Sequence, residues 1–298
     1  MKRALPFILA AFLVGLHAEA RAYCFMTTES PFVEDGNDCT GEGVPLNWRR
    51  PCISISLDER GAIDLDEDAL RGAIERSFGA WTRVSCEGGH PAFNIRLNEA
   101  TVRCKYASFD LEGPNANTIA FADNFEEEGY DESAFAVTVV WYSVDTGEIF
   151  DADILINEDF APYTICPDSG CADPDEIDLE NVLTHEIGHF FGLAHSDEVA
   201  STMYSLAPRG EIQKRTLHQD DRSGFCALYS EPFERSCSFA PVGGLASICA
   251  EDSPPPKKSG RCDAGGGALA ESLIPLALGL LAVRLHERSR RRRHTLNG

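Results

Sequence analysis

Residues 185–195 read HEIGHFFGLAH and hold three of the chain's eight histidines. If this stretch is helical, His185 and His189 lie one turn apart and their rings point the same way. They point away from the apolar stripe of the helix, so we expect them to face a cleft rather than the core. Gly192 can end the helix with a sharp turn, which would return His195 towards the same point.

Three neutral imidazoles that meet at one point are typical ligands of catalytic Zn²⁺, which keeps a further position open for water. Glu186 lies beside the first of them and can take a proton from the zinc-activated water without binding the metal. The pattern therefore predicts one catalytic zinc and hydrolysis of an amide bond, with Glu186 as the general base. The alternative is a helix with two satisfied histidines and a third in a loop. It is disfavoured because a chance match at all five motif positions is rare.

The motif is similar to that of the metzincin metalloproteases, whose second hallmark is a turn that places a methionine beneath the metal. Met203 follows the third histidine by eight residues, in the sequence Ser-Thr-Met-Tyr. Within the metzincins the chain most resembles the matrixin family. Ser196 follows the third histidine, Tyr204 directly follows the methionine, and residues 217–229 look like the last helix of that family.

The matrixin resemblance implies an α/β (α+β) fold of the metzincin type. Its sheet would be twisted, mostly parallel and five-stranded, with one antiparallel edge strand, and three helices would accompany it; the cysteine count, discussed below, adds disulfides to this fold. Residues that would support the site by this resemblance are Gly192, Met203, Tyr204, Asp220 and Asp221. The edge strand beside the cleft would be Ile149–Asn157, and a protein or peptide substrate would add to it as an antiparallel strand.

Two further sets of residues bear on metal binding. Matrixins often hold a second, structural zinc, but His90 and His218 are the only other histidines between residues 23 and 267, so we do not expect that site. Asp151 and Asp153 are interpreted as a solvated strand face, with ligation of Ca²⁺ as the alternative.

Hydrophobic periodicity predicts four strands and three helices. The strands are residues 52–57, 93–97, 137–142 and 149–157. The helices run from Asp64 to about residue 84, from 179 to about 191, and from 217 to 229. This order fits a single α/β domain, placed at residues 48–230, after an N-terminal extension at 23–47.

Residues 1–22 are interpreted as a secretory signal peptide. Lys2 and Arg3 precede an apolar stretch at 5–16, and cleavage fits after Ala20 or Ala22. The alternatives are a membrane anchor or a core helix, but the apolar stretch is short for spanning a bilayer and the small-residue cleavage pattern favours the signal peptide. Ten cysteines lie from Cys24 to Cys249, an even number that suits disulfides in an exported protein. Cys166 with Cys171 and Cys86 with Cys104 are candidate pairs.

The end of the chain has a different composition. Residues 231–262 are interpreted as a cysteine-containing stalk. Residues 263–298 combine small residues, an apolar run and an arginine block, and with Cys262 they resemble the C-terminal sorting signals of myxobacterial surface proteins. The alternative for this tail is a transmembrane anchor. Both interpretations place the body outside the cytoplasm, in the medium or on the outer surface of a bacterium, with the tail as the contact to membrane or cell surface.

Composition limits the function classes. The net charge of −22 disfavours binding to nucleic acid, and a hydrophobic content of 43% disfavours a disordered chain. We therefore expect a secreted or surface-associated zinc endopeptidase. One alternative is a catalytically inactive metzincin-fold binding module, which the retained Glu186 disfavours. The other is a zinc amidase that acts on a non-protein envelope substrate, and residues 205–217, which should shape the substrate pocket, do not decide against it.

Overall fold

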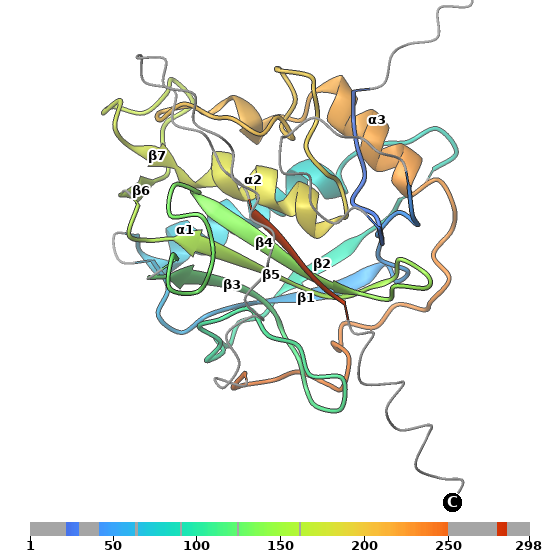
Figure 1. Ribbon diagram of the computed structural model, residues 1–298. Coiled ribbons are helices and arrows are strands. Elements are labelled where there is room, and N and C mark those ends of the chain that lie inside the picture. The colour runs from blue at the N-terminus through green and yellow to red at the C-terminus, as the bar shows by residue number, and fades with distance from the viewer. Residues whose placement is uncertain are drawn as a thin grey trace, which may run out of the picture.

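The computed structural model describes residues 22–29, 42–62, 65–89, 91–123, 125–160 and 162–249, together with the backbone of 279–284. The predicted signal peptide up to residue 21 lies outside the described residues, as do Cys262 and the tail apart from 279–284. In the described part, helices α1 and α2 pack side by side over one face of a twisted mixed sheet, and α3 lies beside the far end of α2 (Figure 1).

Five strands of the domain form the sheet in the order β2-β1-β3-β5-β4. Their bounds are Cys52–Leu57 (β1), Asn94–Leu97 (β2), Asn117–Ala122 (β3), Ala136–Tyr142 (β4) and Ile149–Asn157 (β5). β4 is antiparallel to β5, whereas β2, β1, β3 and β5 pair in parallel. This arrangement confirms the predicted fold class, a mixed five-stranded sheet with an antiparallel edge strand.

Two shorter pairings accompany this sheet. The backbone of Gly279–Arg284 (β8, red in Figure 1) pairs in parallel with the outer side of β4. Tyr163–Thr164 (β6) pairs with Ile177–Asp178 (β7), which leads directly into α2.

The prediction that Ile149–Asn157 is the edge strand is wrong. β5 bonds to β3 on one side and to β4 on the other, so it lies inside the sheet. The two strands form a hairpin, and periodicity alone does not tell which of them lies outside. The sequence pattern does not predict the strand Asn117–Ala122, because both faces of β3 are buried and an alternating pattern is absent.

Three α-helices lie in the described residues: Glu67–Thr82 (α1), Leu179–Phe190 (α2) and Gln219–Leu228 (α3), with a 3₁₀ turn, η1, at Gln213–Arg215. α1 begins later than predicted, because Asp66 is its N-cap and accepts the backbone N–H of Ala69 at 2.9 Å. Asp64 itself lies outside the described residues. α3 begins with a capping box formed by His218 and Asp221.

Tryptophan and phenylalanine side chains join the helices in one core. Trp81 of α1 donates its indole N–H to the carbonyl oxygen of Thr184 in α2 at 2.8 Å. Trp48, which precedes β1, donates in the same way to Phe190 at 2.8 Å. Phe225 of α3 packs against Trp81, with ring centroids 5.5 Å apart. The position of α2 is thus set from both sides by buried aromatic groups.

Four disulfides lie in the described part of the chain: Cys52–Cys237, Cys86–Cys226, Cys104–Cys249 and Cys166–Cys171. The prediction of Cys166–Cys171 is confirmed. The predicted pair Cys86–Cys104 is wrong. Cys86, which lies shortly after the end of α1, forms its disulfide with Cys226 of α3. Residues 231–249 are tied to the rest of the domain at two places. Cys237 bonds to Cys52 of β1, where Ser54 also donates its hydroxyl to the carbonyl of Phe239 at 2.7 Å, and Cys249 bonds to Cys104 in the segment between β2 and β3.

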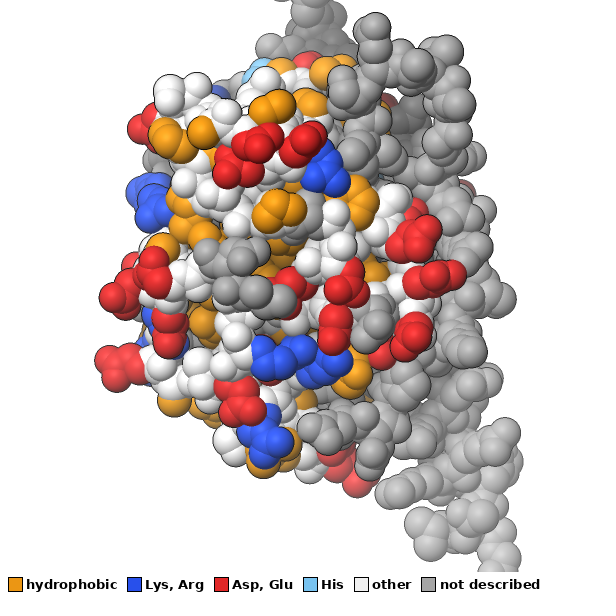
Figure 2. Space-filling view, turned by 90° about the vertical axis from the view of Figure 1, so that its left-hand side faces the viewer, with side chains coloured by type: hydrophobic (Ala, Val, Ile, Leu, Met, Phe, Trp, Pro, Cys, Tyr) orange, Lys and Arg blue, Asp and Glu red, His pale blue; other side chains and the backbone are white. Residues whose placement is uncertain are grey.

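The surface agrees with the acidic composition. Acidic side chains are scattered over the face in Figure 2, with a few Lys and Arg side chains between them. Among the described helices, none combines the length and the apolar character needed to cross a lipid bilayer.

The start of α1 is testable by comparing two alanine substitutions. Asp66→Ala removes the N-cap acceptor, so we expect the free energy of unfolding in urea to fall by about 1 kcal/mol. Asp64→Ala is the matched control and should leave it within about 0.5 kcal/mol. A larger loss for Asp64→Ala would place the N-cap at the start that the sequence pattern predicts, and equal losses would contradict Asp66 as the cap.

Candidate active site

Helix α2 carries the motif through the middle of the protein. Asp178 caps its first turn by accepting the backbone N–H of Asn181 at 2.8 Å. All residues of α2 are buried, because the sheet lies on one side and residues 193–217 fold over the other. His185 and His189 are fully buried, and only His195 of the three histidines is partly exposed.

The three imidazole rings lie together. Their centroids are 4.8 Å apart for His185 and His189, 4.9 Å for His189 and His195, and 5.4 Å for His185 and His195. One nitrogen from each ring lies within 4.8 Å of the other two. The Nε2 atoms of His185 and His189 are 3.1 Å apart. The geometry fits three ligands of one metal ion.

Hydrogen bonds on the far side of two rings determine which nitrogen is free. Nδ1 of His185 lies 2.5 Å from the carbonyl oxygen of Thr202, and Nδ1 of His189 lies 2.8 Å from that of Leu193. A carbonyl only accepts, so both Nδ1 atoms carry the proton and both Nε2 atoms present lone pairs. Nε2 of His195 is buried and has no hydrogen-bond partner among the described residues. Three unshared nitrogen lone pairs at one place are the donor set that Zn²⁺ takes.

Burial also keeps these rings in the form that binds metals. Removal from water lowers the pKa of His189 to about 4 and holds the pKa values of His185 and His195 well below the usual range. The three rings are therefore neutral at pH 7, and no proton has to leave before a cation binds.

Glu186 lies on the same helix and is fully buried. Its Oε2 accepts the hydroxyl of Thr138 on β4 at 2.6 Å, whereas its Oε1 is buried without a partner among the described residues. Burial raises the pKa of Glu186 to about 8, against the opposing effects of the Thr138 hydrogen bond and the charge of Lys214. A carboxyl group with such a pKa can both accept and return a proton near neutral pH.

A sharp turn after α2 brings His195 to the other two histidines. Gly192 has φ of 98°, and a Cβ atom there would overlap the carbonyl oxygen of Leu46. The turn is held by the N-terminal segment: the N–H of Met26 donates to the carbonyl of Gly192, and the N–H of Ala194 to that of Cys24, both at 2.9 Å. Only glycine meets the conformation and the close approach together.

The turn at Met203 lies against α2. The N–H of Ser196 donates to the carbonyl of Met203 at 2.9 Å, which joins this turn to the residue after the third histidine. A Cβ atom on Gly188, between the first two histidines, would overlap the sulfur of Met203. The methionine side chain therefore fills the space that the glycine leaves open.

Two aspartates at the start of α3 support these turns. Asp221 accepts the N–H groups of Thr202 at 2.8 Å and Met203 at 3.0 Å, together with that of His218. Asp220 accepts the hydroxyl of Ser196 at 2.6 Å and the N–H of Tyr23 at 3.1 Å. The first carboxylate holds the methionine turn, and the second links the residue after His195 to the N-terminal segment.

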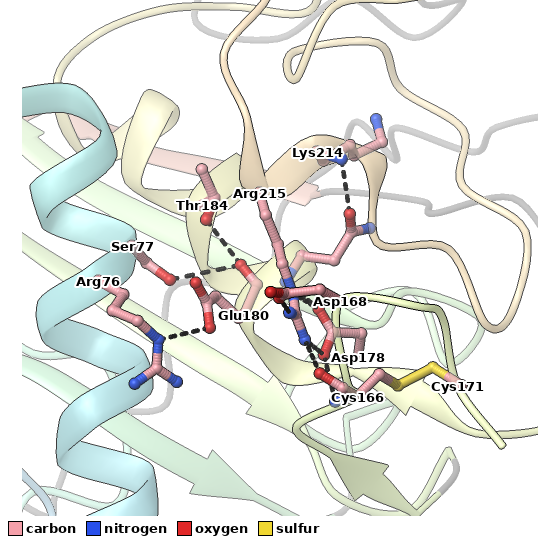
Figure 3. A network of polar contacts seen from close by, with 11 residues as sticks. Arg76, Ser77, Cys166, Asp168, Cys171, Asp178, Glu180, Thr184, Lys214 and Arg215 are labelled. Carbon is pink, nitrogen blue, oxygen red and sulfur yellow. Dashed lines mark hydrogen bonds and ion pairs between the residues drawn. A yellow bond between two sulfur atoms is a disulfide. The ribbon is translucent and has the colours of Figure 1, made fainter.

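Three polar side chains near the motif are not predicted from the sequence: Thr138, Lys214 and Arg215. Thr138 contacts Glu186, as described above. Lys214 is buried, which lowers its pKa to about 8, and its Nζ donates at 3.2 Å to the carbonyl of Thr202 and also to that of Tyr204. Arg215 donates to Asp178 and to the carbonyl of Cys166, so it joins η1 and the disulfide loop to the start of α2 (Figure 3).

Asp151 and Asp153 on β5 are buried, so the prediction of a solvated strand face is wrong. Asp153 accepts the N–H groups of Ser108 at 3.0 Å and Thr118 at 2.7 Å, whereas both oxygens of Asp151 lack a partner among the described residues. Burial raises the pKa of Asp153 to about 8 and raises that of Asp151 strongly. Loop segments cover this face of the sheet, which strand periodicity does not reveal.

Known proteins with similar sequences point to the family that the motif resembles. The family model of the matrixins matches residues 47–230. The Arabidopsis thaliana protein Metalloendoproteinase 1-MMP is 50% identical over 208 residues, which cover 68% of this chain and 50% of that protein. Stromelysin-2 of Rattus norvegicus is 26% identical over 229 residues, or 76% of this chain and 40% of that protein. Metalloendoproteinase 1 of Glycine max is 30% identical over 168 residues, or 55% of this chain and 46% of that protein. The chain thus spans half or less of the length of these relatives.

The contact between Gly188 and Met203 gives a testable substitution. Gly188→Ala places a methyl group on the methionine sulfur, so we expect the free energy of unfolding to fall by about 1–3 kcal/mol. Gly72→Ala is the matched control in α1, where the new Cβ atom meets only the mobile end of Arg76 at 3.1 Å. That control should gain up to about 1 kcal/mol from helix propensity. A neutral Gly188→Ala would contradict the close packing.

The buried pair on β5 predicts a pH dependence of stability. Because burial raises the pKa values of Asp151 and Asp153 in the folded state, the folded chain binds more protons than the unfolded chain between about pH 4 and pH 8. These groups therefore make stability fall as the pH rises through that window. Asp151→Asn should raise stability at pH 8 and flatten the fall between pH 5 and pH 8, as measured by urea unfolding. An unchanged slope would contradict the assignment.

Proposed function

Because this chain belongs to the matrixin family, we propose that it is a zinc-dependent endopeptidase with Glu186 as the general base. The observation that carries this proposal is one cluster of unsatisfied atoms. The imidazole lone pairs of His185, His189 and His195 meet there, and the free Oε1 of Glu186 belongs to the same helix. Buried polar atoms without partners are costly, so the three imidazole nitrogens at one point favour a bound ion, and the free oxygen of Glu186 favours a reacting water.

The roles of the side chains follow from their contacts. His185, His189 and His195 would hold Zn²⁺, which when bound polarises the scissile carbonyl and lowers the pKa of a water molecule. Glu186 would take a proton from the attacking water at Oε1 and pass it to the leaving amine. The carbonyl groups of Thr202 and Leu193 keep two of the imidazoles oriented by accepting their Nδ1 protons.

The outer side of β4 is the place we propose for the substrate backbone. β4 is the antiparallel strand at the margin of the five-stranded sheet, and its Thr138 contacts the general base. An extended peptide can bond to a free strand edge through its main chain. In the intact chain the backbone of Gly279–Arg284 pairs with this side of β4, so a peptide would have to replace it.

We also propose export, with removal of residues 1–22. Cleavage after Ala22 would leave the α-amino group of Tyr23, whose nitrogen lies 3.1 Å from Oδ1 of Asp220. A charged amine at that position would strengthen the contact with the carboxylate, which favours this cleavage site over the one after Ala20. The domain at 48–230, the segment at 231–262, and attachment of the tail to a bacterial cell surface belong to the same proposal.

A calcium ion at Asp151 and Asp153 stays a prediction. The unpartnered oxygens of Asp151 support it, while the two N–H groups that already bond to Asp153 oppose it. Added Ca²⁺ would raise the melting temperature of the wild-type chain, and would not raise that of Asp151→Asn, if these carboxylates bind the ion.

The proposed reaction is tested on the purified full chain by its zinc content and by cleavage of an unfolded protein. We expect about one zinc per chain. Glu186→Gln should keep the zinc and lose nearly all turnover, because the ligands remain while the base is gone. His195→Ala should lose zinc, and Glu75→Gln, on the exposed face of α1, should change neither property.

Full turnover by Glu186→Gln would contradict the role of the base, and full zinc content in His195→Ala would contradict the third ligand. Zinc binding without cleavage of any protein would favour the binding module. Release of amino groups from a peptidoglycan preparation, with proteins left intact, would favour the amidase.

A further inference from the structure

One polar side chain stands out on β4, the strand that crosses under the motif helix. The strand reads AVTVVWY from Ala136 to Tyr142, and its third residue, Thr138, is fully buried. Thr138 is paired with Ile154 of β5 and with Leu280 of β8, so the sheet continues on both sides of β4 at this residue. Its side chain faces α2, where its hydroxyl lies 2.6 Å from Oε2 of Glu186.

A threonine at this position is not needed for packing. Valine has a similar branched side chain and would avoid the cost of burying a hydroxyl group inside an apolar strand. The hydroxyl of Thr138 contacts only Glu186 among the described residues, at Oε2 and, at a longer 3.2 Å, at its carbonyl oxygen. The retained hydroxyl therefore points to a role that involves the carboxylate.

The contact makes the two oxygens of Glu186 different. A hydroxyl has one hydrogen to donate, and the shorter contact gives it to Oε2. Oε2 is then occupied and the carboxylate plane is fixed by the sheet, whereas Oε1 remains without a partner among the described residues. A general base needs one oxygen free and correctly aimed at the water it deprotonates.

We propose that Thr138 is a positioning residue for the reaction: its hydroxyl holds Oε2 of Glu186 and so directs Oε1 to the reacting water. This inference rests on the proposed function, because it assumes that Glu186 is the base. β4 would then have two roles in the reaction: it would align the substrate backbone, as proposed above, and it would align the general base. A shift of the strand would then move substrate and base together.

The activity test compares three variants of the full chain loaded with zinc. Thr138→Val should lower kcat by roughly 10- to 100-fold, as for loss of a partner that orients a metal-site group, with KM changed less than about twofold and zinc content unchanged. Thr138→Ser keeps the hydroxyl and should restore most of kcat. Thr118→Val is the matched control, because Thr118 on β3 is also buried but donates to Ala116. It should keep the wild-type kcat.

A second measurement needs neither zinc nor activity. Urea unfolding of the metal-free chain with Thr138→Val, Glu186→Ala and both changes gives their coupling. The double variant should lose less stability than the two single losses combined, whereas Thr118→Val combined with Glu186→Ala should be additive.

The two measurements separate the inference from the proposed function. Wild-type kcat in Thr138→Val, failure of Thr138→Ser to restore kcat, or additive losses in the metal-free chain would each overturn the role of Thr138. If the wild-type chain cleaves no peptide bond, the proposed function fails, and the coupling in the metal-free chain still decides whether Thr138 holds Glu186.

Discussion

Three imidazole nitrogens and one carboxylate oxygen are held inside this protein without partners of their own, and much of the surrounding structure serves to keep them there. Buried polar atoms normally form hydrogen bonds, and leaving them free costs stability. Here the free nitrogens belong to the cluster of His185, His189 and His195, and the free carboxylate oxygen belongs to Glu186 on the same helix as the first two histidines. The second ring nitrogens of His185 and His189 bond to the carbonyl groups of Thr202 and Leu193, and the second carboxylate oxygen of Glu186 bonds to Thr138.

The surrounding elements can be understood as supports for that arrangement. Asp178 caps the start of α2 and is itself held by Arg215, so α2 is joined to η1. Asp221 holds the methionine turn, whose carbonyl at Thr202 orients the first histidine. The N-terminal segment pairs along the turn that carries the third histidine. Each ligand is thus positioned by a different part of the chain, and α3 links these parts through adjacent carboxylates.

The sequence predicts the parts of the site that depend on local geometry. A spacing of four places His185 and His189 on one side of a helix, and Gly192 permits the turn that returns His195. The sequence does not predict the contacts between segments that lie far apart along the chain. Thr138 is 48 residues from Glu186, and nothing in an apolar strand marks which face will meet α2. The order of β4 and β5, the partner of Cys86 and the burial of Asp151 likewise depend on how separate elements assemble.

The central claim is that three imidazoles share one zinc ion, and X-ray absorption at the zinc edge of the purified full chain tests it most directly. The account predicts scattering from three imidazole nitrogens at about 2.0–2.1 Å, together with one oxygen, and none from sulfur. A first shell that contains sulfur, or fewer than three imidazoles, would contradict it, because the ion would then lie at a different site.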